Sequence, residues 1–250
     1  MIMYASTQTI VLRITMSEMR IQKYIAHAGI CSRRKAEQHI INGHVEINGK
    51  TIQTPGIKID PEKDRISIFG KPVYCCSQMI YIALNKPRGI VTSCNHPGEK
   101  IVTDLVKTTQ RLYPVGRLDK DSSGLLLLTN DGNLHHKISH PSFNHEKEYQ
   151  VSVRRKISDH DLMKMADGIV FDNKKTRPAT VRRMNAREFQ ITLKEGRNRQ
   201  IRRMLEQLHH QVTHLHRIRI DHIHIDKLKT GKWRYLSKKE IRQFDKMLRN

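Results

Sequence analysis

The chain has 250 residues, which is enough for one large domain or for two unequal ones. Lysine and arginine together number 46 and the acidic residues 24, so the net charge is +22, and a surface of this charge attracts polyanions over a long range. Because no apolar run is long enough to span a bilayer, a transmembrane helix is excluded, and RNA or DNA is the favoured class of partner.

The first residues do not form a recognisable element. In residues 1–18 polar residues interrupt the apolar positions, and no small-residue cleavage site follows an apolar block, as a signal peptide would require. We expect either a disordered lead or a start codon that has been assigned too early. Met16 and Met19 are then plausible starts, because organised sequence begins at Arg20.

Two short helices and a hairpin are predicted over residues 20–68. Apolar side chains recur at helical spacing from residue 21 to 28, and Ser32 can cap a second helix. Alternating apolar and polar residues then lead to Asn48-Gly49, a strong signal of a hairpin turn. Cations in the first turn of a helix oppose its dipole, a small cost that favours a phosphate-bearing partner. The second helix carries three of them there: Arg33, Arg34 and Lys35.

A second module is predicted from residue 80 to the end, after a short linker over residues 70–79. Strand-like and helix-like runs are mixed in it without a regular βαβ rhythm. We therefore expect an α+β domain built on a mixed, mainly antiparallel β-sheet that is flanked by helices. The expected strands are 80–84, 125–129, 149–153 and 189–193, and the expected helices are 159–166 and 199–208.

One unusual stretch of this module, residues 111–132, reads RLYPVGRLDKDSSGLLLLTNDG. Asp119 lies in a predicted loop before the four leucines of a buried strand, where a rigid scaffold could present a functional side chain. Spacing alone, however, predicts an ordinary turn residue, because an aspartate in a turn is usually a local cap.

Several motifs in a fixed order resemble those of a known family, the RsuA/RluB/RluF family of ribosomal RNA pseudouridine synthases. They are GRLDKDSSGLLLLTNDG around Asp119, IALNKPRGIV at 82–91, HEKEYQVSV at 145–153, EGRNRQIRRM at 195–204, and the closing motifs VTHLHRIRI and GKWRYL. The run IQKYIAHAGICSRRKAEQHIINGHVEING at 21–49 resembles the S4 RNA-binding domain. The wording of these motifs is closest to the RluF branch, which acts on large-subunit rRNA.

The resemblance implies an S4 RNA-binding domain over residues 19–69 and a pseudouridine synthase catalytic domain over residues 80–250. It implies an isomerase that converts a specific uridine to pseudouridine in ribosomal RNA, either in 23S rRNA or in a large-subunit assembly intermediate. The reaction needs no outside atoms, and we expect no cofactor. We further expect a cytoplasmic monomer.

The resemblance also implies roles for individual residues. Asp119 occupies the position of the essential carboxylate, which acts either as a nucleophile on the sugar or as a base that removes a sugar proton. Tyr149 matches the tyrosine that stacks on the extruded uracil, and Arg202 matches the arginine that pairs with the aspartate. Arg117 matches the residue that fills the space left by the flipped nucleotide, and Leu215 matches an apolar wall of the pocket.

The remaining basic residues are interpreted as RNA contacts. Only part of the cationic run 194–203 can surround one carboxylate, so the others are expected to contact the RNA backbone: Arg197, Arg199 and Arg203. The same role is expected in the S4-like module for Arg33, Arg34 and Lys35. For these three, a solvated helix face is the alternative.

No metal site is predicted. The four cysteines include no C-x-x-C pair and are too few for a disulfide scaffold, which favours a reduced cytoplasmic setting. In the histidine-rich segment 209–224 four histidines share strand parity, namely His214, His216, His222 and His224, but no supporting acids accompany them. They could instead add pH-dependent charge to an RNA-facing edge. Asp121 suggests a carboxylate pair with Asp119, but it matches no second acid of the family and is interpreted as structural.

Two other interpretations of function remain open. A non-catalytic S4-domain RNA-binding or ribosome-assembly factor would explain the basic module and the charge equally well, although it would not need a lone carboxylate in a cationic cleft. The same enzyme could also act on 16S rRNA or tRNA, because family members share their catalytic residues and differ in target.

Overall fold

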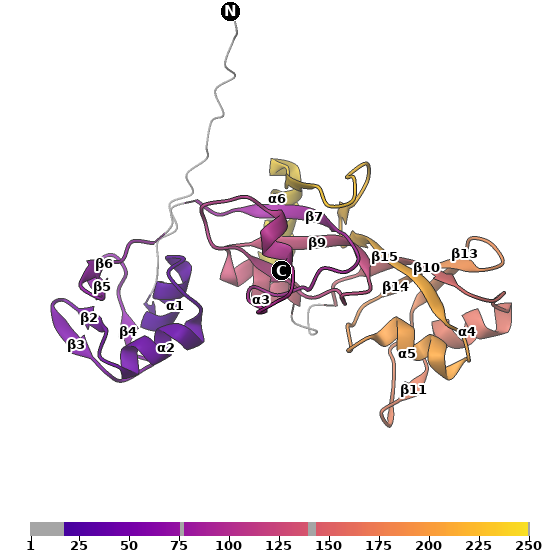
Figure 1. Cartoon of the computed structure of the whole chain (residues 1–250), viewed down its shortest axis with the longest axis horizontal. Helices are drawn as coiled ribbons and strands as arrows, with labels where there is room; N and C mark the ends of the chain where they lie inside the picture. Colours follow the sequence, from indigo (N-terminus) through magenta and orange to yellow (C-terminus); the bar gives the residue numbers. More distant parts are fainter. Residues whose placement is uncertain (1–17, 76–77, 140–143, 250) are drawn as a thin grey trace, which may run out of the picture. The chain divides into compact units, whose positions relative to one another are not determined.

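The computed structural model describes residues 18–75, 78–139 and 144–249, and the expected lead over residues 1–18 lies outside them except for its last residue. The chain divides into two compact units, Met1–Met79 and Ile80–Asn250 (Figure 1).

In residues 18–75, the described part of the first unit, there are two helices and two small sheets. The helices are α1 (Ile21–His27) and α2 (Arg33–Ile41). One sheet has the strand order β3-β2-β5-β6, and its strands are β2 (Val45–Ile47), β3 (Lys50–Ile52), β5 (Ile66–Ile68) and β6 (Lys71–Pro72). The other sheet pairs β1 (Met19–Arg20) with β4 (Lys58–Ile59).

The local signals in this unit are confirmed. The Ser32 hydroxyl caps α2 by accepting a hydrogen bond from the Lys35 amide at 3.2 Å. Asn48 and Gly49 turn the chain between β2 and β3 with φ of 52° and 79°. Part of the expected linker over residues 70–79 is folded, since β6 pairs with β5 and Val73 is buried in the core of this unit.

The second unit is built on a nine-stranded sheet in the order β13-β14-β10-β15-β9-β7-β17, with β8 on β9 and β16 on β15. Among the strands that the structure describes in this sheet, only β15 and β9 pair in parallel, so the sheet is mixed and mainly antiparallel, as expected. Its strands are β7 (Tyr81–Lys86), β8 (Tyr113–Val115), β9 (Ser123–Thr129), β10 (Lys147–Val153), β13 (Thr180–Arg183), β14 (Glu188–Leu193), β15 (Val212–Ile220), β16 (Ile223–His224) and β17 (Trp233–Tyr235).

Helices and one small hairpin accompany this sheet. They are the 3₁₀ helix η1 (Val102–Leu105), α3 (Gly132–Ser139), α4 (Asp159–Asp167), α5 (Gln200–Gln207), α6 (Lys238–Arg249) and the hairpin of β11 (Val170–Phe171) with β12 (Lys174–Lys175). Figure 1 shows α4 and α5 on one side of β10, β14 and β15, where their side chains form a common apolar core with these strands.

Strand β9 lies at the centre of the unit and is buried on both faces. Leu125 and Leu127 belong to one apolar cluster, and Leu126 and Leu128 belong to another on the opposite face. This explains why four leucines follow one another without the alternation of a half-exposed strand.

The start of β9 is brought against β15 by Gly124. This glycine pairs with Arg217 and has a φ of 108°, and a Cβ atom on it would lie 2.3 Å from the Arg217 carbonyl oxygen. The close approach therefore requires glycine, and it brings the loop before β9 next to the strand that carries Leu215.

Candidate active site

The loop that carries Asp119 lies between β8 and β9 and is held through its backbone. The Ser122 amide donates to the Asp119 carbonyl at 3.0 Å, which closes the turn. The Thr92 hydroxyl donates to the Leu118 carbonyl at 2.6 Å, which fixes the preceding residue from another segment. The Asp119 side chain itself remains 30% exposed.

Lys86, at the end of β7, anchors this loop from the interior. Its side chain is fully buried, and its Nζ donates to the carbonyls of Pro87 (3.0 Å), Asp119 (3.1 Å) and Ser122 (2.8 Å). Burial lowers the pKa of the Lys86 ammonium to about 8, against the opposing effect of the nearby carboxylates of the Asp119 loop. The loop is thus held by a buried amine whose donors all point at backbone carbonyls.

A cleft joins this loop to the central strands of the sheet. Three of the residues predicted from the sequence line it, Asp119 from the loop, Tyr149 from β10 and Leu215 from β15. Strands β10 and β15 are hydrogen-bonded neighbours, which brings the last two together. The cleft holds about 980 Å³ of empty space, part of it open to solvent. Three more predicted residues lie along it: Arg117, Arg197 and Arg199.

The two arginines closest to the loop contact it in different ways. Arg199 Nη1 lies 4.0 Å from the Asp119 carboxylate and 3.7 Å from that of Asp121. Arg202 is 8% exposed, and its Nη2 donates to the Asp121 carbonyl at 3.1 Å and to the Ser122 hydroxyl at 3.3 Å. Arg202 thus contacts the loop through Nη2, and its expected pairing with the Asp119 carboxylate stays a prediction.

Arg197 and Arg203, which we expected to contact the RNA backbone, make contacts within the protein. Arg197 donates to two carbonyl oxygens of β12, and Arg203 forms a two-pronged ion pair with Asp172 in the β11–β12 turn. Both guanidinium groups lie over the Phe171 ring, at 5.3 and 4.5 Å from its centroid. These two arginines fasten the hairpin to the basic segment through both Nη atoms of each guanidinium.

The floor of the cleft carries a buried cation. Arg217 is 2% exposed, its Nε donates to the Leu125 carbonyl at 2.7 Å, and its Cζ lies 6.0 Å from the centroid of the Tyr149 ring. Lys147, two residues before Tyr149 on β10, also lines the cleft, and burial together with the charge of Arg217 lowers the pKa of its ammonium. Positive charge therefore lies beneath and beside the tyrosine ring.

A buried histidine–carboxylate pair contributes one residue, His145, to the lining of the cleft. His145 Nδ1 lies 2.6 Å from the Asp221 carboxylate, and both side chains are almost fully buried. The other carboxylate oxygen of Asp221 accepts a hydrogen bond from the Glu146 amide at 2.9 Å. The pair thus ties the start of β10 to the turn after β15.

Sequence reasoning missed Lys86, Arg217 and the His145–Asp221 pair. All but Asp221 stand inside the quoted family motifs, and this was the signal that could have identified them. No other feature of the sequence indicates that Lys86 and Arg217 are buried, because a charged residue in a strand is normally expected to face solvent.

The histidines of the histidine-rich segment make separate contacts within the protein. His214 and His216 stack with their ring centroids 5.7 Å apart, and His216 Nδ1 lies 2.9 Å from the Ser123 hydroxyl. His222 Nε2 lies 2.8 Å from the Glu240 carbonyl. Within residues 18–75, 78–139 and 144–249, no three histidine, cysteine or acidic side chains are grouped to hold a metal ion.

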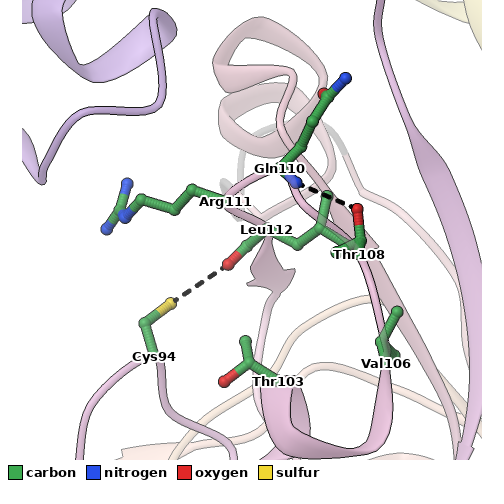
Figure 2. Close-up of a pocket in the computed structure, with 7 residues that line it drawn as sticks. All are labelled: Cys94, Thr103, Val106, Thr108, Gln110, Arg111 and Leu112. Atoms are coloured by element: carbon green, nitrogen blue, oxygen red, sulfur yellow. Dashed lines mark hydrogen bonds between the residues drawn. The ribbon is translucent and has the colours of Figure 1, made fainter.

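A separate pocket lies beside the segment that precedes β8 (Figure 2). It contains none of the predicted site residues, and the Cys94 thiol at its edge lies 3.9 Å from the Leu112 carbonyl. Burial raises the pKa of this thiol, which disfavours the reactive thiolate.

Three basic residues that we expected to contact RNA are exposed in the first turn of α2: Arg33, Arg34 and Lys35. They belong to the other compact unit and are not part of the cleft. Of the helices that the structure describes, none is long and apolar enough to cross a membrane.

Comparison with protein families gives two matches. Residues 80–207 match the model of the RNA pseudouridylate synthase family, and residues 19–66 match the S4 domain.

Known proteins and structures resemble the chain over most of its length. It is 40% identical to ribosomal large subunit pseudouridine synthase B of Bacillus subtilis, over 90% of this chain and 94% of that protein. It is 38% identical to the dual-specificity RNA pseudouridine synthase RluF of Escherichia coli K12, over 94% of this chain and 81% of that protein. A crystal structure of a pseudouridylate synthase superposes with a TM-score of 0.67 at 30% identity, covering 90% of this chain and 99% of the other.

Proposed function

Because the chain belongs to the RNA pseudouridylate synthase family, we propose that it converts a specific uridine to pseudouridine in ribosomal RNA, and that its target lies in the 23S rRNA of the large subunit. The name of the Bacillus subtilis relative, a large-subunit enzyme, supports this choice of RNA. We also propose that the enzyme acts as a monomer in the cytoplasm.

The two family matches and the division of the chain at residue 79 support a division of labour. We assign RNA recognition to an S4 domain that extends from residue 19 to about residue 73, and catalysis to residues 80–250. In this assignment Arg33, Arg34 and Lys35 bind RNA phosphates from the first turn of α2.

In the proposed reaction the bond between uracil N1 and the ribose C1′ breaks, the base turns, and a new bond joins C1′ to C5. N1 gains a proton and C5 loses one, so no outside atoms are consumed. Asp119 is the proposed catalytic residue, either as a nucleophile on the sugar or as the base that removes a sugar proton. This proposal rests on two observations. The Asp119 carboxylate lies 4.0 Å from the guanidinium of Arg199, and Asp119 lines the same cleft as Tyr149.

Recognition of the uracil is assigned to the floor of this cleft. A base that has been taken out of its stack needs a new partner, and the Tyr149 ring can supply one. The cation of Arg217, 6.0 Å from the ring centroid, favours the electron-rich face of that tyrosine and fixes its position. Leu215 supplies an apolar wall, and exposed Arg117 is proposed to occupy the space that the nucleotide leaves.

Arg202 and Lys86 are proposed as positioning residues. They donate to the carbonyls of Asp119, Asp121 and Ser122, so they fix the loop in the absence of RNA. A preorganised carboxylate needs little rearrangement when the substrate arrives. Arg199, whose Nη1 lies 4.0 Å from the Asp119 carboxylate, is proposed as the guanidinium beside it, and the pairing of Arg202 with that carboxylate stays a prediction.

Primer extension after carbodiimide treatment tests this function directly. Ribosomal RNA is compared from cells with the gene, cells without it, and cells that carry Asp119→Asn in its place. We expect one carbodiimide-dependent stop in 23S rRNA that is present only with the intact gene.

Each other outcome bears on a different part of the proposal. A site in 16S rRNA or tRNA would overturn the choice of RNA and keep the enzyme. The printed name of the RluF relative, a dual-specificity enzyme, makes tRNA the first alternative to examine. A site that persists with Asp119→Asn would support the non-catalytic alternative, an S4-domain assembly factor.

A further inference from the structure

An exposed phenylalanine occupies an unfavourable turn position in the S4-like unit. The β5–β6 hairpin turns at Phe69 and Gly70, whose φ angles are 52° and 70° (Figure 1). The β2–β3 hairpin of the same sheet turns at Asn48 and Gly49, with φ of 52° and 79°. Asparagine and glycine tolerate this left-handed region, whereas a bulky aromatic residue is strained there. Turn formation alone therefore does not account for Phe69.

The rings of two histidines pack against the Phe69 ring. The ring centroid of Phe69 lies 4.6 Å from that of His44 and 5.0 Å from that of His39, and the two histidine Nδ1 atoms are 3.5 Å apart. The Phe69 amide also donates to the His44 carbonyl at 2.9 Å. Despite these contacts Phe69 remains 59% exposed. The ring is therefore held in place while much of its surface stays open.

Two cations neighbour this aromatic cluster, which consists of His39, His44 and Phe69, along the chain. Lys35 precedes His39 by one helical turn on α2. Burial lowers the pKa of His39, and the charges of His44 and Lys35 add to this effect. Lys71, two residues after Phe69, is exposed on β6. A fixed aromatic face between flexible cations is the combination that binds an unpaired base and its phosphates.

We propose that the aromatic cluster of His39, His44 and Phe69 is a stacking platform for an unpaired base of the RNA substrate, distinct from the uracil that reacts in the cleft. The proposal rests on RNA being the substrate, as argued above. Lys35 and Lys71 bind the phosphates on either side of the stacked base. Strained backbone positions cluster at binding sites, which agrees with a binding role for Phe69 at this turn.

The comparison of the two hairpins suggests a discriminating variant. Phe69→Asn gives the β5–β6 turn the same residue pair as the β2–β3 turn, so it relaxes the backbone and removes the ring at once. We expect the full-length variant to unfold at the wild-type temperature or above it. We expect its dissociation constant for 23S rRNA transcribed in vitro to rise about 5- to 150-fold, which corresponds to the loss of one base–aromatic stack.

Two further variants control this measurement. Tyr74→Ala removes another exposed aromatic side chain, 77% exposed and outside the cluster, and should leave the dissociation constant unchanged. Phe69→Trp should keep the affinity, and its emission should be quenched by RNA. Trp233 is the only tryptophan of the wild-type chain, so the wild-type signal can be subtracted.

The outcome separates the platform from the catalytic proposal. Phe69→Asn should retain wild-type turnover at saturating RNA, whereas Asp119→Asn should retain binding and lose turnover. Unchanged RNA affinity in Phe69→Asn would overturn the platform and leave the proposed enzyme intact. A fall in unfolding temperature that accompanies the loss of affinity, with no quenching of the additional emission in the Phe69→Trp variant, would show a structural role and would also overturn it.

Discussion

At the scale of single residues, the candidate site separates the groups that hold the catalytic loop from the group that faces the cleft. Lys86 and Arg202 bind backbone carbonyls of the Asp119 loop, and both side chains are buried. Among the described residues, Arg199 is the cation that reaches the Asp119 carboxylate within 4.0 Å. The protein itself therefore supplies the hydrogen-bond donors that position the Asp119 carboxylate before RNA binds.

Substitutions of Tyr149 test the stacking role. Tyr149→Phe keeps the ring, so we expect near wild-type kcat/KM. Tyr149→Ala removes it and should lower kcat/KM by about 5- to 150-fold, the equivalent of about 1–3 kcal/mol for one stacked base. Steady-state kinetics on an rRNA fragment decides between these outcomes. Equal losses in both variants would contradict stacking and would indicate a role for the hydroxyl.

The sequence predicts which residues line the cleft better than it predicts which contacts the long side chains make. Asp119, Tyr149 and Leu215 could be assigned to one cleft because ordered family motifs contain them. The sequence does not reveal that Arg203 pairs with Asp172. An arginine that contacts RNA and an arginine that holds a hairpin have the same local sequence pattern. The destination of a long, flexible side chain depends on tertiary contacts that the local pattern does not encode.

At the scale of elements, periodicity predicted the main strands better than their pairing. The uninterrupted leucines of β9 indicated a buried strand, and the structure confirms this and shows burial on both faces. The parallel contact between β9 and β15 could not be derived, since it depends on the backbone of Gly124 lying against that of Arg217. A glycine in a strand indicates only that some close approach is possible.

The end of the sheet is joined to α6 by a charged contact that should make stability depend on pH. Glu240 accepts two hydrogen bonds from Arg234, at 2.9 and 2.7 Å, and its side chain is 18% exposed. Burial alone would raise the pKa of Glu240, but hydrogen bonds from Arg234 and Ser237 lower it to about 2. The lowered pKa means that this contact stabilises the folded state above pH 4.5 and that the effect is lost as the pH falls towards 2.

Glu240→Gln tests this contact. We expect the variant to lose about 1–3 kcal/mol of unfolding free energy at pH 7, and we expect the difference from wild type to shrink as the pH falls from 4.5 to 2. Urea unfolding at several pH values measures both effects. Lys239→Gln, at an exposed position of the same helix, is the matched control. A difference that stays constant down to pH 2 would contradict the assignment.

At the scale of the whole molecule, the net charge of +22 should dominate the affinity for RNA. Each phosphate that a cation neutralises releases counterions, so the affinity falls as salt rises. We expect the triple variant Arg33→Gln, Arg34→Gln, Lys35→Gln to bind rRNA more weakly and to reduce the slope of log affinity against log salt by about 2. Filter binding at several salt concentrations measures this slope.

A control variant distinguishes these cations from the general charge. Lys63→Gln removes one cation that is paired with Asp60, at 3.0 Å, and that lies away from α2 in the sequence. Its slope should match the wild type. An unchanged slope in the triple variant would assign the S4-like unit a role other than phosphate binding and would leave the catalytic unit as the source of RNA affinity.

The presence of an S4 domain and of a pseudouridine synthase domain could be predicted from the sequence because each carries its own ordered motifs. The choice between an enzyme and a binding protein of the same fold could not be made in this way, because both would keep the S4 module and the positive charge. That choice depends on whether the carboxylate of Asp119 does chemistry.

Release of tritium from rRNA that carries [5-³H]uridine measures this chemistry, because C5 loses its hydrogen only when the new bond forms. We expect Asp119→Asn to bind this RNA with wild-type affinity and to release no tritium. Asp121→Asn changes the neighbouring carboxylate, 3.7 Å from the same arginine, and should retain activity. Tritium release by Asp119→Asn at the wild-type rate would contradict the central claim.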